Sequence, residues 1–163
     1  MSAPGTAPSP VVLITGGATG IGRAVAAACG RSGATVVLLS LPGPELSQAI
    51  DELSGAGVAA QAVAADVRDF AAVQQAAGQV HGELGRIDAL VASAGIADQS
   101  SITSGSPERW QQVVQTNLLG TANAIRAVAP LMLAAGAGDI VMIASASATR
   151  SARSCRPATS GSR

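Results

Sequence analysis

The chain has 163 residues and a formal net charge of zero, and 48% of its residues are hydrophobic while 12% are charged. This balance excludes a disordered acidic or basic polymer, and the length suits a single domain. Nucleic-acid binding is not expected because the body has no basic face, and no apolar run approaches the roughly 20 residues of a membrane helix. No secretory signal and no cluster of metal ligands is visible, so we expect a cytoplasmic protein without a metal site.

Short apolar runs alternate with stretches of helical periodicity along the chain. Strands are predicted at 11–15, 35–39, 58–65, 89–92 and 139–144. Helical patterns fill the intervals at 21–33, 46–53, 69–84 and 107–136. Strands separated by helices predict parallel pairing, so the expected fold class is α/β, a Rossmann-like doubly wound sheet of about five strands that is incomplete. We divide the chain into a flexible leader at 1–10, a dinucleotide-binding domain at 11–145 and a disordered Arg/Ser-rich tail at 146–163.

The last predicted helix is the longest. Ser106 is the expected N-cap and Pro107 the first helical residue. Apolar residues between Trp110 and Val128 fall on one stripe, which we interpret as core or interface. Pro130 is expected to kink or divide the helix before Gly136.

A glycine-rich segment, Thr15–Gly22 (TGGATGIG), joins the first strand to the first helix. Gly16 allows a sharp turn, and Gly20 and Gly22 allow close approach of backbone to a ligand and of helix to sheet. The free N–H groups of the helix N-terminus then favour a pyrophosphate. A plain tight turn is the alternative, but the strand–turn–helix context that the motif requires is present.

Two further positions bear on the nucleotide. Ser40 stands at the end of the second strand, where an acidic residue would bind the adenosine ribose. Serine in place of an acidic residue slightly favours NADP. No nearby arginine from that strand end, however, would clamp a 2′-phosphate. Asp66, at the end of the third strand, is placed either to accept from an adenine amino group or to cap the next helix before Asp69. Both interpretations stay open from the sequence.

Several motifs, taken together, resemble those of the short-chain dehydrogenase/reductase family. They are TGGATGIG at 15–22, ADV at 65–67, GRIDALVASAG at 85–95, NLLGT at 117–121 and GDIVMIASASA at 138–148. The resemblance covers nearly all of residues 11–148 and implies hydride transfer between NAD(P)(H) and a small-molecule alcohol or carbonyl. It implies homo-oligomer formation as a possibility, and a cofactor site at Thr15, Gly16, Gly20, Ile21, Gly22, Ser40, Asp66, Val67, Ala94 and Gly95.

The resemblance implies catalytic-site roles for Asn117, which helps to hold the site, and for Ser145, which bonds the substrate oxygen. Asn117 also falls on the apolar stripe of its helix, where a buried amide needs partners; a core asparagine that bridges backbone groups is the alternative. Ser145 follows the fifth strand at the edge where such sheets bind ligands, although serine is also common at strand ends.

Two departures from the family pattern concern the chemistry. The family's Asn-Asn-Ala-Gly appears as Ala92-Ser93-Ala94-Gly95, and its catalytic Tyr and Lys are matched by Thr159 and Arg163. The chain has no tyrosine, and all ten of its basic residues are arginine. Family members continue with a further helix, strand and substrate segment, so we expect a C-terminally truncated and inactive member, or a non-catalytic dinucleotide-binding or interaction module.

Overall fold

The computed structural model describes residues 8–98, 100 and 103–145. Its centre is one five-stranded sheet in the order β3-β2-β1-β4-β5, with every neighbouring pair parallel. The strands are β1 (Val11–Thr15), β2 (Thr35–Ser40), β3 (Ala60–Ala64), β4 (Ala89–Ala92) and β5 (Asp139–Met142). The predicted five-stranded Rossmann-like sheet is therefore confirmed.

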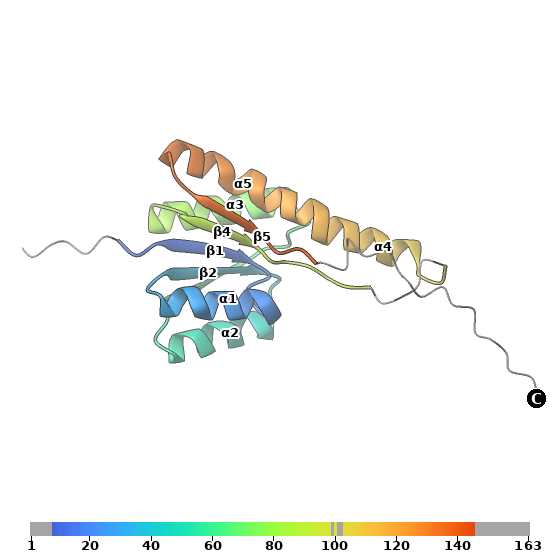
Figure 1. The fold of residues 1–163 in the computed structure, drawn as a ribbon, viewed down its shortest axis with the longest axis horizontal. Helices are drawn as coiled ribbons and strands as arrows, with labels where there is room; N and C mark the ends of the chain where they lie inside the picture. Colours follow the sequence, from blue (N-terminus) through green and yellow to red (C-terminus); the bar gives the residue numbers. More distant parts are fainter. Residues whose placement is uncertain (1–7, 99, 101–102, 146–163) are drawn as a thin grey trace, which may run out of the picture.

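Helices cover both faces of this sheet (Figure 1). Helices α1 (Gly20–Arg31) and α2 (Pro44–Gly55) lie on one face, and α3 (Phe70–Leu84) and α5 (Gly120–Ala135) lie on the other. Because both faces of the central strands are covered, β1 and β2 consist almost entirely of apolar residues rather than alternating with polar ones.

The alternation of side chains along β1 and β2 divides the core into two clusters. Leu13 and Val37 pack with residues of α3 and α5, whereas Ile14 and Leu38 pack with residues of α1 and α2. All four are at most 1% exposed. The apolar periodicity in the sequence thus translates directly into two helix layers that hold the strand ends in place.

Two helices begin directly after a residue whose side chain caps the helix N-terminus. The Ser106 hydroxyl accepts from the Arg109 N–H at 3.1 Å at the start of α4 (Pro107–Val113), as predicted. The Asp69 carboxylate accepts from the Ala72 N–H at 3.2 Å at the start of α3. Asp69, and not Asp66, is therefore the cap of this helix, and the capping interpretation of Asp66 is wrong.

The long helical run differs from its prediction. Pro130 lies inside α5 and does not divide it, whereas a π-helical segment, η1 (Val114–Leu119), separates α4 from α5. The predicted stripe is broken, since Trp110 is 62% and Leu118 64% exposed. A wider turn changes the direction in which side chains point, which accounts for Leu118 inside η1 but not for Trp110, which precedes it. Helix α4, which carries Trp110, extends past the end of the sheet (Figure 1), and no strand among the described residues lies beneath it there.

The combined run Pro107–Ala135 is 29 residues long and is apolar enough, by length and composition alone, to cross a membrane. The expectation from the sequence concerned uninterrupted apolar runs, whereas this helix includes the charged residues Glu108, Arg109 and Arg126. Core helices of soluble proteins pass the same test, and α5 packs against α3 and β4.

Candidate functional site

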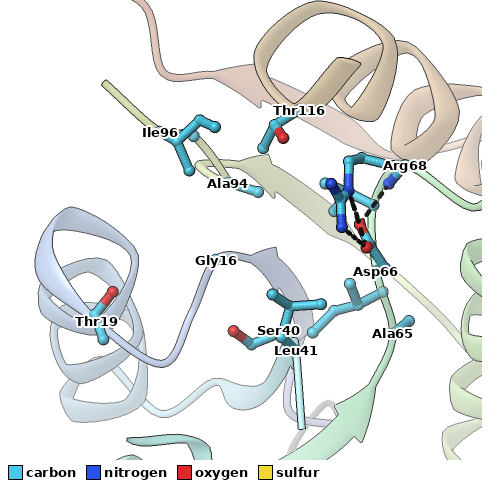
Figure 2. A pocket seen from close by; sticks show the side chains of 13 residues that line it. Gly16, Thr19, Ser40, Leu41, Ala65, Asp66, Arg68, Ala94, Ile96 and Thr116 are labelled. Carbon is cyan, nitrogen blue, oxygen red and sulfur yellow. Dashed lines mark hydrogen bonds and ion pairs between the residues drawn. The ribbon is translucent and has the colours of Figure 1, made fainter. Parts of the chain in front are cut away.

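A cavity of about 260 Å³ opens at the carboxyl edge of the sheet. From β1 the strand order runs to β2 and β3 on one side and to β4 and β5 on the other, so the cavity lies where the strand order reverses. Open α/β sheets bind ligands at this point. Figure 2 shows side chains from the ends of several strands meeting around it. Most of the predicted cofactor residues line it, namely Gly16, Ser40, Asp66, Val67, Ala94 and Gly95.

The turn between β1 and α1 needs glycine for two different reasons. Gly16 has φ +66°, and a Cβ there would lie 2.7 Å from the Ala94 Cα. A Cβ at Gly22 would overlap the Gly16 carbonyl oxygen, so Gly22 allows α1 to begin directly against the turn. Gly20, with φ +52°, has open space where a Cβ would stand. The close approach predicted at Gly22 is thus an approach of backbone to backbone, whereas the space beside Gly20 is open. Gly16, predicted to allow a sharp turn, also brings that turn against the backbone of Ala94.

Four predicted cofactor residues lie outside the cavity lining, namely Thr15, Gly20, Ile21 and Gly22. Thr15 is 1% exposed, and its hydroxyl oxygen accepts from the N–H groups of Ser93 and Ala94, each at 3.2 Å. Thr15 therefore positions the segment after β4 and does not face the cavity. Ile21 is 60% exposed in the first turn of α1.

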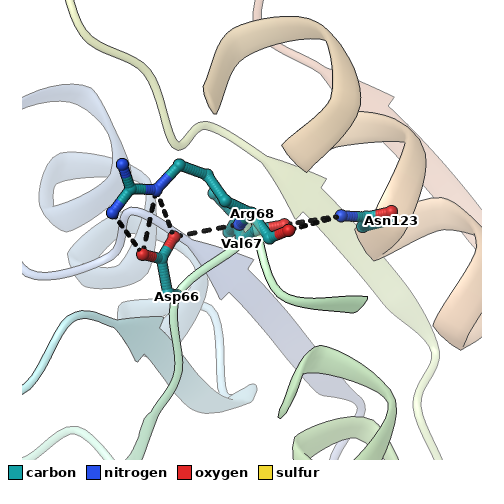
Figure 3. A network of polar contacts seen from close by, with 4 residues as sticks. All are labelled: Asp66, Val67, Arg68 and Asn123. Carbon is teal, nitrogen blue, oxygen red and sulfur yellow. Dashed lines mark hydrogen bonds and ion pairs between the residues drawn. The ribbon is translucent and has the colours of Figure 1, made fainter. Parts of the chain in front are cut away.

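At the opposite wall, Asp66 and Arg68 form a paired unit (Figures 2 and 3). The Asp66 carboxylate accepts from the Arg68 main-chain N–H at 2.9 Å and from the guanidinium Nε and Nη2, the latter at 2.6 Å. These hydrogen bonds, aided by the nearby positive charge, hold the pKa of Asp66 below its ordinary value, while partial burial opposes the shift. The wall therefore carries a fixed carboxylate that is ionised at neutral pH.

Arg68 was missed by the sequence reasoning. The expectation concerned arginines near the end of β2, whereas Arg68 follows β3 and lines the same cavity as Ser40 and Leu41. The signal was available, since Arg68 directly follows the Asp66–Val67 motif. Asn123 was also missed: its Nδ2 donates to the Val67 carbonyl at 2.9 Å and so ties α5 to this wall (Figure 3).

The two predicted catalytic residues stand outside the cavity lining. Asn117 is exposed, not buried, because η1 turns it out of the core; its amide donates to the Ile96 carbonyl and accepts from the Ile96 N–H, both at 2.9 Å. These contacts correspond to the alternative kept open above, an asparagine that bridges backbone groups. Thr116, which directly precedes Asn117, does line the cavity. Ser145 is exposed beyond the end of β5.

The remaining predictions lie partly outside the described residues. Thr159 and Arg163, together with the tail at 146–163 and most of the leader, belong to the undescribed parts of the chain. Within the described residues, no three His, Cys, Asp or Glu side chains form a group that could hold a metal ion.

Comparison with known proteins decides the family. The model of the short chain dehydrogenase family matches residues 10–158. The chain belongs to this family. Among curated short chain dehydrogenases, it is 41% identical to the D-threitol dehydrogenase of Mycolicibacterium smegmatis over 139 residues, which are 85% of this chain and 54% of that one. It is 36% identical to the 2,3-dihydro-2,3-dihydroxybenzoate dehydrogenase of Bacillus subtilis over 135 residues, or 83% and 52% of the two chains.

Solved structures of the family have the same fold. A variant of actinorhodin polyketide ketoreductase with NADPH superposes with a TM-score of 0.83 at 33% identity, covering 87% of this chain and 55% of that chain. A 3-oxoacyl-[acyl-carrier protein] reductase with bound NAD from Brucella melitensis gives a TM-score of 0.78 at 36% identity, with 86% and 55% covered. The chain thus spans about half the length of the relatives it matches.

Proposed function

We propose that this chain binds a nicotinamide dinucleotide, NAD(P)(H), with the adenosine half in the cavity at the carboxyl edge of the sheet. The observation that carries the proposal is the cavity itself, because it joins the Gly16 turn to the wall formed by Asp66 and Val67. Its volume of about 260 Å³ lies just below the roughly 300–1,000 Å³ of pockets that enclose whole drug-sized ligands, so it is suited to part of a dinucleotide.

The residues present fit such a ligand. The turn at Gly16 and Gly20 leads into the N-terminus of α1, whose N–H groups and helix dipole favour a pyrophosphate. Ser40 stands where the adenosine ribose would bind, and its small neutral side chain accepts either a 2′-hydroxyl or a 2′-phosphate. Relatives are solved with NADPH and with NAD, so both forms belong in the test.

The reaction class we propose is that of the family, interconversion of a small-molecule alcohol and carbonyl, to which the nicotinamide ring would supply the hydride donor or acceptor. Thr159 and Arg163 stand where family members carry the catalytic Tyr and Lys. An aliphatic hydroxyl cannot be tuned toward neutral pH as a phenol can. Loss of a general acid–base group costs roughly 10²–10⁴-fold in rate, so we expect binding with little or no turnover.

A second candidate is a dinucleotide-binding module without catalytic activity. The replacement of both family catalytic residues favours it. The two candidates share the binding step and differ in hydride transfer, which can be followed by nicotinamide absorbance with a panel of small alcohols and carbonyl compounds. Turnover that depends on the chain would exclude the module.

Binding is tested by titrating NADH and NADPH against the purified chain and following nicotinamide fluorescence. The informative variant is Gly16→Ala, and its matched control is Gly33→Ala. Both glycines have positive φ, +66° and +91°, so both substitutions strain the backbone, but only Gly16 faces the cavity, and Gly33 has open space around it. We expect loss of binding for Gly16→Ala alone. A folded wild-type chain that binds neither dinucleotide would overturn the proposal.

A further inference from the structure

Strand β5 forms the edge of the sheet opposite β3, and within the described residues it pairs with β4 alone. The main-chain N–H groups of Asp139 and Ile143 donate to carbonyl oxygens of the segment that contains β4, both at 2.9 Å. Because alternate residues of a strand turn their N–H and C=O groups to opposite sides, Ile140 and Met142 present theirs away from β4. These two residues therefore offer a row of donors and acceptors to a further strand.

The residues of β5 do little to protect this edge. Soluble proteins usually guard an edge strand with a lysine, a proline or a bulge. Asp139–Met142 contains no lysine and no proline, and its pairing with β4 runs without interruption. The strand and the residue after it carry the exposed apolar sequence Ile-Val-Met-Ile at 140–143. An edge of this kind is a template for pairing with another chain.

Apolar surface is exposed on both faces beside β5. Ile140 lines a groove of about 390 Å³ with Met132 and Leu133, the latter 80% exposed at the end of α5. Val141 points to the opposite face, because successive side chains of a strand alternate, and it continues the surface of its pairing partner Val91. A strand added at this edge would therefore cover apolar side chains on both faces of the sheet.

We propose that β5 pairs with β5 of a second copy of this chain, antiparallel and about a two-fold axis at Val141, so that one sheet runs through the dimer. In this register Ile140 lies opposite Met142 of the second copy, and each such pair exchanges two main-chain hydrogen bonds. Val141 lies opposite Val141 of the second copy in a non-hydrogen-bonded pair, where side chains come closest. The inference goes beyond the dinucleotide site and does not depend on it.

The charges of the strand favour this orientation over the others. Parallel pairing in register would place two Asp139 carboxylates side by side, which is unfavourable for like charges. Antiparallel pairing about Val141 places Asp139 opposite Ile143, with the two carboxylates at opposite ends of the strand pair. Pairing of β5 with β3 of another copy would repeat without closing. The formal net charge of the chain is zero, so no long-range repulsion opposes the approach of two copies.

The oligomeric state of the 163-residue chain is the first test. A contact based on one short strand is small, so we expect a monomer–dimer equilibrium with a dissociation constant on the order of 10–100 µM in analytical ultracentrifugation. A chain that stays monomeric up to about 1 mM, tenfold above that range, overturns the proposal. Species that grow beyond a dimer without limit, as expected for β5 on β3, overturn it too.

Cysteine cross-linking tests the register. Cys29 and Cys155, the two cysteines of the chain, are first replaced by alanine. Val141→Cys then lies opposite itself at the spacing that a disulfide requires, and it should cross-link under mild oxidation about tenfold faster than the control. The control is Leu118→Cys, which is also exposed but lies in η1 rather than at the sheet edge. Equal rates, or faster cross-linking at Leu118, would place the contact elsewhere and overturn the proposal.

Amide hydrogen exchange, followed by NMR, tests the hydrogen bonds without any substitution and decides the matter if the cysteine-free chain does not fold. As the dimer forms, the amides of Ile140 and Met142 should exchange about tenfold more slowly, whereas those of Asp139 and Ile143, already bonded toward β4, should change little. Dimerisation that leaves the exchange of Ile140 and Met142 unchanged contradicts the proposal. The dinucleotide site is tested separately by NADH binding, so failure of either proposal leaves the other standing.

Discussion

The two edges of the sheet are both exposed, but their compositions differ. β3 is Ala-Gln-Ala-Val-Ala, so an edge with small and polar side chains faces solvent. β5 exposes large apolar side chains instead, with Ile140 38%, Val141 49% and Met142 59% exposed. Small or polar residues are typical of strands that meet water, whereas the residues of β5 are typical of strands covered on both faces.

The strand register shows which part of the sheet the helices leave uncovered. Val141 pairs with Val91, which is 6% exposed and packs in the cluster beneath α1 and α2. Paired residues of neighbouring strands share a face, so Val141 continues the same apolar surface to the edge. The helices of that face contact β1, β2 and β3. The side chains of β3 are thus suited to solvent, whereas those of β5 are of the kind found in covered strands.

The largest effect is expected between the two edges, in β2. Leu38→Ala removes a side chain that is 0% exposed and should lower the free energy of unfolding by about 2–5 kcal/mol. Val63→Ala at one edge and Val141→Ala at the other should each cost clearly less, because both side chains already contact water. Urea unfolding followed by circular dichroism measures all three. A cost for Val141→Ala equal to that of Leu38→Ala would mean that β5 is buried in solution.

A smaller effect on stability is expected from the hydrogen bond that joins α5 to the segment after β3. Asn123 in α5 donates to the Val67 carbonyl just beyond β3, and Gly120 in the same helix packs against Val67. Asn123→Ala removes the donor and should cost about 0.5–1.5 kcal/mol in urea unfolding. Gln79→Ala is the control, because it removes an exposed side-chain hydrogen bond to Glu83 within α3, outside the cavity lining. Since Asn123 braces the cavity wall, its variant should also weaken NADH binding, and the Gln79 variant should not.

The fold was predictable from the sequence because it depends on local patterns. Apolar runs located β1 and β4 to the residue, the first closed by Gly16-Gly17 and the second preceded by Asp88. Ser106 and Pro107 located the start of α4. The candidate cofactor residues near Gly16 and Asp66 followed from the motifs, since carboxyl ends of parallel strands meet at one edge.

What could not be predicted depends on geometry between segments. The π-helical segment at 114–119 has no signal in apolar periodicity, which assumes regular turns, and it moved Asn117 from the expected core to the surface. Thr15 belongs to the glycine motif, yet its hydroxyl bonds to the segment after β4, far away in the chain. Arg68 and Asn123 meet the site only because β3, β4 and α5 come together.

The exposed position of Val141 allows the two edges to be compared without a change in the core. Val141→Lys places a charge on the apolar edge, and a charged side chain is a common means of preventing edge-to-edge association. We expect a change in unfolding free energy within about 0.5 kcal/mol, as for most exposed positions, and a clear loss of concentration-dependent self-association in sedimentation. Ala62→Lys in β3 is the control and should leave association unchanged. Equal association of all three chains would show that β5 attracts no neighbour.

The smallest effect on stability is expected from two ion pairs, Arg68–Asp66 at the carboxyl edge of the sheet and Arg86–Asp88 at the amino edge. Hydrogen bonds from Arg68 lower the pKa of Asp66, and those from Arg86 lower the pKa of Asp88, both from an ordinary value of 3.8. A lowered folded-state pKa stabilises the fold above about pH 4, and this stabilisation is lost as the pH falls through the folded-state value. Arg68→Met and Arg86→Met should therefore both raise the midpoint of acid unfolding slightly and equally. The shifts are measured by circular dichroism. Because the exposed fractions of Asp66 and Asp88 are nearly equal at 29% and 27%, the variant with the larger shift would identify the edge of the sheet that holds its ion pair more tightly.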